Sequence, residues 1–485
     1  MKKLLALIIA LITVFSLAAC TNGSKGNNNG GNKPQTTPDA EETYPLPEAD
    51  FDAKDFRIGM IEGYQIEFYT MLEDESDPID YALYQRNKTV EDRFNVTITP
   101  VYTGGTGYTG HVDIILNSIM SDTDEYDLTS TYTFASGNLV MSGALRDWAS
   151  QKYTNLDASY WVGSINDNFS IEDHIYTAVG DTNVTSIIYT YGILMNRTLG
   201  NKLKVANGTN ITDDVFATIR DEEWTIDYFN NVVAGVYQDI DDEPGKSHND
   251  LFGLNCETLT NVDMYNFAFD LPMIDNKGEE LLEFVYNKEK ASTVTEKILD
   301  LYWNNQGTLV NGDYVGNFPA GRALFITCVL EDCFRFFRNM EDDYIILPYP
   351  MLDENQDDYY TGMLGDHYVL GMPVTCADPD FASFVTEAIN IEAERYMVPA
   401  YYEQSLQGKF ATDETSLEML QLLMDGRRED FGSLFQANLD NVSCWLRWVV
   451  QSKENGMFQY IDERAEYMDS LLSKIIDKYR EGAAS

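Results

Sequence analysis

The cysteine at position 20 lies in a sequence context that suits chemistry on its thiol. It follows Leu17-Ala18-Ala19, at the end of an uncharged and mostly apolar stretch, residues 4–19, which itself follows Lys2 and Lys3. A basic start, a short apolar run and small residues before the break are typical of a secretory signal. The pattern predicts that the Cys20 thiol accepts a diacylglycerol group through a thioether bond. The alternative is an ordinary signal that happens to end near a cysteine.

Other reactive side chains lack the spacing of a metal site or a hydrolase. The histidines are scattered along the chain, at His111, His174, His248 and His367. Asp239-x-Asp241-x-Glu243 resembles a calcium loop, but Pro244 stands at the sixth position, where an EF-hand needs glycine. No Gly-x-Ser-x-Gly motif occurs, and with 79 acidic residues a pair of carboxylates says nothing about glycoside hydrolysis. We therefore predict no metal, no cofactor and no catalytic residue.

The residues around Cys20 predict a membrane anchor. Residues 1–20 are expected to form a lipoprotein signal peptide that ends in a lipobox, and the apolar run is marginal for spanning a bilayer. Residues 21–50 are rich in Asn and Gly and then in Pro, Thr and Glu, without an apolar period, which predicts a disordered tether. About 30 such residues reach roughly 30 Å. Acyl chains, palmitate among them, would hold the protein at the extracellular face of the cell membrane by this lipid anchor alone.

Charge and cysteine usage exclude two classes of protein. The chain has 79 Asp and Glu against 33 Lys and Arg, a net charge of −46. Such a surface repels phosphate backbones, so nucleic-acid binding is disfavoured. Five cysteines remain besides Cys20, an odd number without a Cys-x-x-Cys pair, and a disulfide framework is therefore not expected.

After residue 50, segments with strand-like and helix-like patterns alternate. Strands are expected at 56–61, 95–102 and 127–132, with helices at 79–94 and 112–120, where apolar residues recur at helical spacing. This order predicts parallel strands joined by crossover helices, and hence an α/β fold. Farther along, strands are expected at 175–179, 186–195, 344–347 and 368–372, and helices at 225–237, 294–303, 381–397, 416–424 and 461–480.

The residues that leave the strands are the first candidates for ligand contacts. In open α/β sheets, ligands bind beyond the carboxyl ends of the strands. Glu62, Gly63 and Tyr64 follow the first expected strand, and Tyr132, Thr133 and Phe134 end the third. We expect Tyr64, Tyr132, Thr133 and Phe134 to contact a ligand.

Short motifs that follow one another through the body resemble a known family. They are Arg86-Asn87-Lys88-Thr89-Val90-Glu91-Asp92-Arg93-Phe94-Asn95-Val96, Asp124-Glu125-Tyr126-Asp127-Leu128, Gly143-Ala144-Leu145-Arg146-Asp147, Ile193-Leu194-Met195-Asn196-Arg197, Glu223-Trp224-Thr225-Ile226-Asp227, Phe318-Pro319-Ala320-Gly321-Arg322-Ala323-Leu324-Phe325 and Val398-Pro399-Ala400-Tyr401-Tyr402-Glu403. In this order they resemble family 1 of the extracellular solute-binding proteins, which serve ABC importers for sugars. The last motif is typical of the clostridial branch of that family.

The resemblance implies a two-lobed periplasmic-binding-protein fold, the Venus flytrap of type II, with hinge crossovers between the lobes. Lobe 1 would comprise residues 51–188 plus 359–402, and lobe 2 residues 189–352 plus 403–485. Residues 353–358 would form an acidic loop near a hinge crossover. Closure of such a hinge around a ligand creates a shape that a membrane partner can recognise.

The resemblance also extends the set of ligand-binding candidates. It adds Asp181, Thr185, Glu331, Asp332, Asp366, Tyr368 and Asp430. Sugars suit such residues, because aromatic faces cover C–H patches while carboxylates bond to hydroxyls. Substitution of Tyr132 or Asp366 by alanine is expected to weaken binding with little change in melting temperature. Trp161, Trp224, Trp445 and Trp448 are weaker candidates, and the first two are expected to pack at helix starts.

The implied function is capture of a carbohydrate, more readily an oligosaccharide, by a monomeric, non-enzymatic protein that delivers it to ABC permease subunits. Two alternatives stay open from sequence alone. One is a surface carbohydrate sensor or adhesion protein, which would lack a partner permease. The other is a surface glycoside hydrolase or esterase, which would turn its ligand over.

Overall fold

The computed structural model of the chain describes residues 44–61, 78–105, 109–240, 245–276, 281–363, 365–407 and 413–483. The chain divides into two compact units, Met1–Pro47 and Glu48–Ser485, and every element below belongs to the second. The signal peptide with Cys20, the ligand candidate Tyr64 and most of the 239–244 loop lie outside the described residues. The described end of the predicted tether, 44–50, contains no helix or strand.

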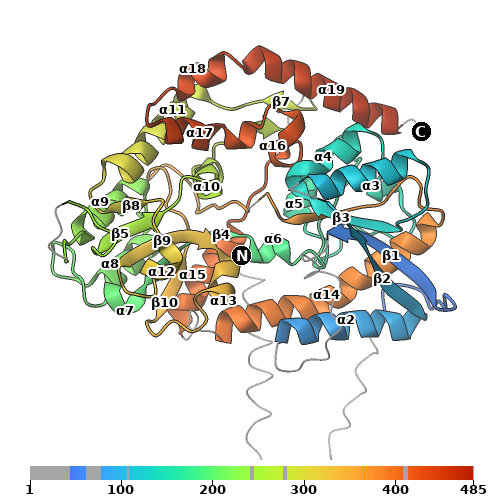
Figure 1. Ribbon diagram of the computed structural model, residues 1–485, viewed down its shortest axis with the longest axis horizontal. Helices are drawn as coiled ribbons and strands as arrows, with labels where there is room; N and C mark the ends of the chain where they lie inside the picture. Colours follow the sequence, from blue (N-terminus) through green and yellow to red (C-terminus); the bar gives the residue numbers. More distant parts are fainter. Residues whose placement is uncertain are drawn as a thin grey trace, which may run out of the picture. The chain divides into compact units, whose positions relative to one another are not determined.

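The first sheet has the order β11-β3-β1-β2, and β1, β2 and β3 are labelled in Figure 1. Its strands are β1 (Lys54–Ile61), β2 (Val96–Thr103), β3 (Leu128–Tyr132) and β11 (Tyr368–Gly371). β1 pairs in parallel with β2 and β3, and β11 adds an antiparallel edge in which Tyr368 pairs with Tyr132. The crossover helices are α2 (Pro78–Phe94) and α3 (Gly110–Met120). The predicted strand–helix alternation of this lobe is confirmed.

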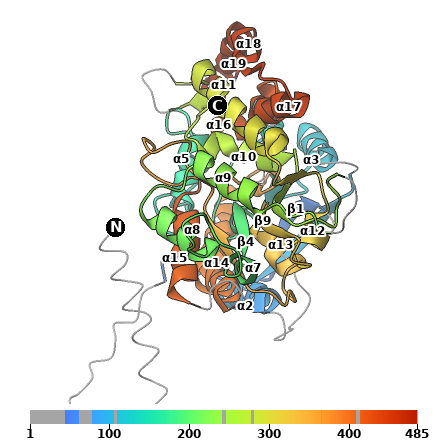
Figure 2. The ribbon, with the colours of Figure 1, turned by 90° about the vertical axis from the view of Figure 1, so that its left-hand side faces the viewer.

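The second sheet has the order β10-β4-β9-β5-β8. Its strands are β4 (Tyr191–Asn196), β5 (Phe252–Cys256), β8 (Thr308–Val310), β9 (Ala323–Val329) and β10 (Tyr344–Leu347). β5 pairs in parallel with β8 and β9, whereas β4 is antiparallel to β9 and β10. β4, β5 and β9 are buried along their whole length, because helices cover the sheet on both faces. Figure 2 shows this lobe from the side of α8, α9 and α13.

The remaining elements connect and cover the two sheets. In the first half of the chain they are α4 (Thr133–Met141), η2 (Trp148–Ser150), α5 (Gly163–Phe169), α6 (Thr185–Ile188), α7 (Arg197–Gly200), α8 (Ile211–Arg220) and α9 (Ile226–Val236). In the second half they are α10 (Thr260–Ala268), β6 (Ile274–Asp275), β7 (Glu283–Phe284), α11 (Lys288–Leu299), a π-helical turn η3 (Asp300–Asn304), α12 (Tyr314–Asn317), α13 (Leu330–Arg335), α14 (Pro379–Gln407), α15 (Glu414–Asp425), α16 (Phe431–Leu434), η4 (Gln436–Asn438), η5 (Val442–Cys444), α17 (Trp445–Ser452), α18 (Met457–Asp462) and α19 (Ala465–Ala483). No helix in the described part of the chain is both long and apolar enough to cross a bilayer.

One expected strand is absent, and another begins later than expected. Residues 175–179 form only an isolated bridge, Ala178 with Leu370 on the outer edge of β11, because the amides of Ile175 and Val179 donate to the side chains of Asp147 and Asn166 instead. The segment 186–195 begins instead as the short helix α6, and its strand, β4, starts at Tyr191. Apolar residues in a short run do not by themselves separate a buried strand from a buried helix.

Helices α2 and α14 pack side by side, as the ribbon shows (Figure 1). Leu83 of α2 lies in one buried cluster with Met397 and Tyr401 of α14. The same cluster includes Val184 and Ile188, at the approach to the first crossing between lobes. The helix pair therefore packs against the chain where it leaves the first lobe.

The chain segments that cross between the two sheets pair with one another. Thr190 bridges Met363 in antiparallel fashion, and Thr361 bridges Arg427 in parallel. The amide of Tyr191 donates to the Gly362 carbonyl at 3.1 Å. These three paired segments form the hinge. The lobe borders given above stay a prediction, and the C-terminal segment contacts both lobes, α16 packing on α4 and α17 on α10.

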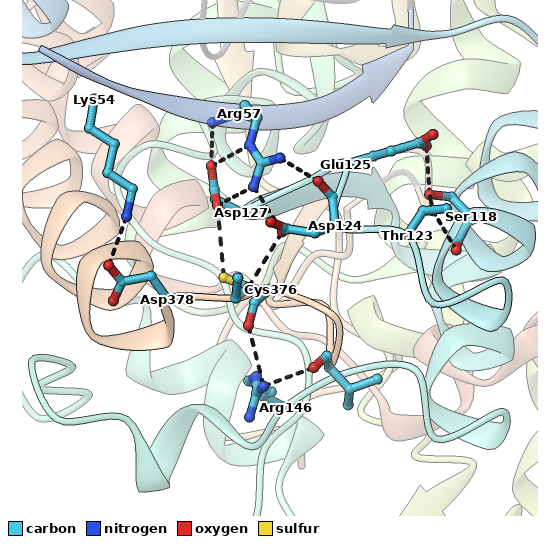
Figure 3. Close-up of polar contacts among 12 residues, drawn as sticks. Lys54, Arg57, Ser118, Thr123, Asp124, Glu125, Asp127, Arg146, Cys376 and Asp378 are labelled. Carbon is cyan, nitrogen blue, oxygen red and sulfur yellow. Dashed lines mark hydrogen bonds and ion pairs between the residues drawn. The ribbon is translucent and has the colours of Figure 1, made fainter.

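A polar network fixes the amino-terminal side of the first sheet (Figure 3). The Arg57 guanidinium on β1 donates to both oxygens of Asp127, at 3.0 and 2.8 Å, just before β3. It also donates to the carboxylate and carbonyl of Asp124. The Cys376 thiol lies 3.9 Å from Asp127. These bonds hold β1 and β3 in register, and the opposite end of β3 carries part of the candidate site.

Candidate ligand-binding site

An aromatic stack forms where β3 ends. Tyr132 stacks on Tyr368 with ring centroids 4.9 Å apart, and on Phe134 with centroids 5.6 Å apart. The His111 ring meets Tyr132 edge-on at 4.8 Å. Tyr132 and Tyr368 are only 3% and 2% exposed, so neither ring offers a face to a ligand. Phe134 is partly exposed and is the ring of this stack that reaches the surface.

Behind the stack, a buried hydrogen-bond network ties the first lobe to the hinge. The amide and hydroxyl of Thr133 both donate to the His367 carbonyl, at 2.9 and 2.8 Å. His367 Nε2 lies 3.0 Å from Glu429 Oε2, and both side chains are shielded from water. Thr185 accepts the amide hydrogen of Tyr368 at 3.0 Å. Thr133 and Thr185, both predicted as ligand residues, therefore bond to protein groups here.

Asp366, next to this network, lies within electrostatic range of a cation that the sequence did not reveal. Burial raises the pKa of the partly exposed Asp366 carboxyl, while the charges of His367 and Arg447 oppose that shift. Arg447 lies on α17, and its side chain is 19% exposed. As the only basic residue of an amphipathic helix that also carries two tryptophans, Arg447 could have been noticed in the sequence.

Arg447 contacts only one of the two carboxylate oxygens of Asp263. Its Nε lies 3.3 Å from Asp263 Oδ2, and its Nη2 donates to the Cys444 sulfur at 2.7 Å. Among the described residues, Asp263 Oδ1 has no hydrogen-bond partner although it is buried. Burial raises the pKa of Asp263 to about 8 against the opposing charge of Arg447. An arginine can donate to both oxygens of a carboxylate. The Arg447–Asp263 pair therefore lacks the second of the two possible hydrogen bonds.

Acidic groups also gather at the carboxyl ends of β5 and β9 in the second lobe. Tyr314 donates to Asp332 Oδ2 at 3.1 Å. Burial raises the pKa of Asp332 to about 6, with Tyr314 opposing and Glu331 and Glu257 adding to the shift. Burial likewise raises the pKa of both glutamates. Strand ends of this kind are the binding side of an α/β sheet.

Tyr191 connects this cluster to Asp263. Its hydroxyl lies 2.6 Å from the Thr260 hydroxyl, at the start of α10. Burial raises its pKa, and the charges of Asp332 and Asp263 both add to that shift. The charges of Asp366, Arg447, Asp263 and Asp332 therefore act on the same region, with Arg447 and Asp263 in contact.

Two predicted residues lie apart from this chain of groups. Burial and then Glu394 raise the pKa of Asp181 to about 7, against the charge of Arg427. Asp430 accepts backbone hydrogens from Met273 at 2.9 Å and Gly432 at 2.7 Å, which caps α16 and holds β6. Burial raises its pKa to about 6 despite these bonds. The Asp430 carboxylate is therefore occupied by the backbone.

The four tryptophans considered from the sequence differ in their exposure to solvent. Trp148 and Trp161 contact each other, and Trp161 donates to Glu387 at 3.0 Å within the fold. Trp224 and Trp445 are completely buried. Trp448, beside Arg447 on α17, is 41% exposed.

The five cysteines beyond Cys20 are buried free thiols. The described residues contain no cluster of three or more His, Cys, Asp or Glu side chains that could hold a metal ion.

Comparison with known proteins gives a likeness at the level of the fold. No protein-family model and no curated protein matches the sequence. Among solved structures, an ABC transporter solute-binding protein from Thermotoga lettingae bound to α-D-tagatose is 11% identical, with a TM-score of 0.53 over 86% of this chain and 100% of that one.

Two further structures are similar to the same extent. A cyclo/maltodextrin-binding protein in complex with maltotetraose is 8% identical, with a TM-score of 0.54 over 88% of this chain and 96% of that one. A de novo designed esterase is 12% identical, with a TM-score of 0.55 over 87% and 100%. The fold is therefore the two-lobed α/β fold found in solute-binding proteins.

Proposed function

We propose that this chain is an extracellular solute-binding protein that captures a carbohydrate between its two lobes. The observation that carries the proposal is the partly exposed Phe134, whose amide donates to the Gly365 carbonyl next to Asp366 at 3.3 Å, on the segment that enters β11. Arg447 of α17 lies near enough for its charge to act on the Asp366 carboxyl. These groups come from both sides of the hinge, so one ligand in contact with all of them would hold the lobes together.

The chemistry of these groups suits a sugar. An aromatic ring covers the apolar C–H face of a pyranose, and a carboxylate accepts hydrogens from its hydroxyls. A hydrogen bond to a charged group contributes about 1.5–3 kcal/mol net. Tyr314 with Asp332, at the strand ends of the second lobe, adds polar groups to those around Asp366, which suits a ligand of more than one sugar ring. An oligosaccharide is therefore the preferred ligand, and the clostridial type of family 1 the preferred affiliation.

Delivery to an ABC permease and attachment through Cys20 complete the proposal. The paired hinge segments allow an open and a closed arrangement, which a permease can distinguish. The lipobox supports a lipid anchor at the extracellular face, where a monomeric receptor would meet its transporter. Binding without turnover is expected.

The test is a thermal-shift panel of mono- and oligosaccharides on the full-length protein in detergent, with the mixtures analysed for product. A ligand at a hundred times its Kd should add about 2.7 kcal/mol of stability. Asp366→Asn should abolish the shift, whereas Asp469→Asn, on the exposed face of α19, should keep it. A panel without any shift would contradict carbohydrate capture, and product formation would show an enzyme instead.

A further inference from the structure

The carboxyl end of α5 accepts hydrogen bonds from side chains of two distant segments. A helix leaves its last carbonyls without partners inside the helix. Asn276 Nδ2 lies within hydrogen-bond distance of three carbonyls at this end, those of Asp167 (3.1 Å), Asn168 (2.9 Å) and Ser170 (3.1 Å). The Tyr479 hydroxyl donates to the remaining one, the Phe169 carbonyl, at 3.0 Å. Four consecutive carbonyls therefore have partners that come from outside α5.

α5 itself is fixed to the first lobe. The Asn166 side chain donates to the Val179 carbonyl at 3.0 Å and accepts the Val179 amide hydrogen at 2.7 Å. Next to Val179, Ala178 bridges Leu370 of β11, the edge strand of the first sheet. The end of α5 is therefore expected to move together with the first sheet.

Asn276 and Tyr479 come from segments that the second lobe holds. Asn276 follows β6, which pairs with β7, and Phe284 of β7 meets the Trp445 ring edge-on with centroids 6.0 Å apart. Trp445 begins α17, which packs on α10, the helix that follows β5 of the second sheet. Tyr479 lies on α19, which also packs on β7. Both donors therefore reach the first lobe from the second.

The contacts at α5 lie apart from the segments that cross between the lobes. Figure 1 shows β7, α18 and α19 at the top of the view, above α6 and β4, where the chain first crosses. α18 packs on α11, and the far end of α19 adds an edge-on contact between the rings of Tyr479 and Tyr176, with centroids 5.0 Å apart. A lobe that turned about the crossing segments would carry the end of α5 away from both donors.

We propose that the carboxyl end of α5, with Asn276 and Tyr479, forms a latch that holds the two lobes together, and that the lobes separate only after these hydrogen bonds break. Donors at a helix C-terminus are favourably placed, because the last carbonyls carry its partial negative charge. Every donor and acceptor of the latch belongs to the protein, so the latch acts with or without a ligand. Asn276 and Tyr479 are positioning residues, and the inference does not depend on the ligand being a sugar.

The distance between spin labels on the two lobes tests the latch. Asn117→Cys on α3 and Ala217→Cys on α8 place the labels at exposed positions, and Cys20→Ser in the same full-length chain leaves only the five buried thiols besides them. Without ligand, Asn276→Ala should raise the ratio of open to closed distances about tenfold, which corresponds to about 1.4 kcal/mol. Tyr479→Phe removes one donor and keeps the ring, and should change the ratio in the same direction.

A matched control separates the latch from a general loss of stability. Asn287→Ala removes the acceptor of the Lys290 amide hydrogen at the start of α11, within the second lobe. It should lower the melting temperature and leave the distances between labels unchanged. The latch would be refuted if Asn276→Ala and the double variant Asn276→Ala/Tyr479→Phe lowered the melting temperature but kept the wild-type distances, since the contacts would then only stabilise α5. An equal opening in Asn287→Ala would refute it as well.

Discussion

Tyr132 and Tyr368 occupy paired positions of β3 and β11, and their rings stack 4.9 Å apart at an interplanar angle of 20°. This contact joins the carboxyl end of a parallel strand to the strand that returns from the hinge. Both rings are buried, and Phe134 extends the stack to the surface. The stack therefore supports the candidate site from behind, and Phe134 is its accessible face.

Burial changes the expected effect of substituting Tyr132. From sequence, Tyr132→Ala is expected to leave the melting temperature nearly unchanged, but removal of a large buried aromatic ring costs about 3–5 kcal/mol. We now expect Tyr132→Ala to lower the free energy of unfolding by about that amount. Phe134→Ala, at a partly exposed ring, should lower it by less while weakening sugar binding. Urea denaturation of the two variants measures the difference, and equal losses would contradict the assignment of Phe134 as the accessible ring.

Asp332 should make stability depend on pH below neutrality. Burial raises the pKa of Asp332 in the folded state from 3.8 to about 6. Between about pH 4 and about pH 6, the Asp332 carboxyl is deprotonated in the unfolded chain and still protonated in the folded chain. The stability that this group contributes therefore falls as pH rises from about 4 to about 6. A shift of this size corresponds to about 3 kcal/mol.

Asp332→Asn removes this titration. The variant should gain stability relative to the wild type as pH rises through that window, when urea denaturation is repeated at each pH. Asparagine keeps an acceptor for the Tyr314 hydroxyl. Asp343→Asn, on the exposed surface of the same lobe, is the matched control. A constant difference between wild type and Asp332→Asn across the window would contradict the prediction.

Asp430 is expected to contribute mainly to stability, through hydrogen bonds to backbone amides. Its carboxylate accepts three amide hydrogens, from Met273, Ile274 and Gly432. Loss of a single helix cap costs about 0.5–2 kcal/mol, so Asp430→Ala should cost more than Asp313→Ala, which removes the cap of α12. Thermal unfolding compares the two. The sugar affinity of Asp430→Asn then tests the sequence-based prediction that Asp430 binds ligand, since a structural residue would leave affinity nearly unchanged.

Cys20 should decide where the protein is found in a cell. Full-length protein is expected in the membrane fraction and should incorporate labelled palmitate, because a thioether-linked lipid and acyl chains anchor stably together. Cys20→Ser should appear in the soluble fraction without label. Cys444→Ser, at a buried thiol, is the control and should behave like the wild type. Membrane retention of Cys20→Ser would contradict the lipid anchor.

The lobes could be derived from sequence because their signals are local. Apolar spacing over ten to twenty residues predicted β1, α2, β2, α3 and β3, and the strands pair in parallel as such an order requires. The failures were short apolar runs such as 175–179, whose strand character depends on a free sheet edge. Here only Ala178 pairs with β11, which comes nearly two hundred residues later in the chain, because the Ile175 and Val179 amides bond to the Asp147 and Asn166 side chains.

The candidate site could be derived only in part. Strand ends and family motifs pointed to Phe134, Asp332 and Asp366, whereas Arg447, Asp263 and Glu429 were missed. Their partners lie far away in sequence, as with His367 and Glu429, which are 62 residues apart. Nothing in a local pattern indicates which distant side chains a hinge brings together.

The sequence by itself determined the predicted anchor, the acidic surface and the alternating α/β order, because each follows from composition or from the period of neighbouring residues. Tertiary structure alone decided which polar residues face one another and which are buried. It buried Tyr132 against Tyr368, bonded the Asp430 carboxylate to backbone amides and paired Arg447 with Asp263. The physical reason is that desolvation and hydrogen-bond partners depend on every segment packed around a group, and those segments come from the whole length of the chain.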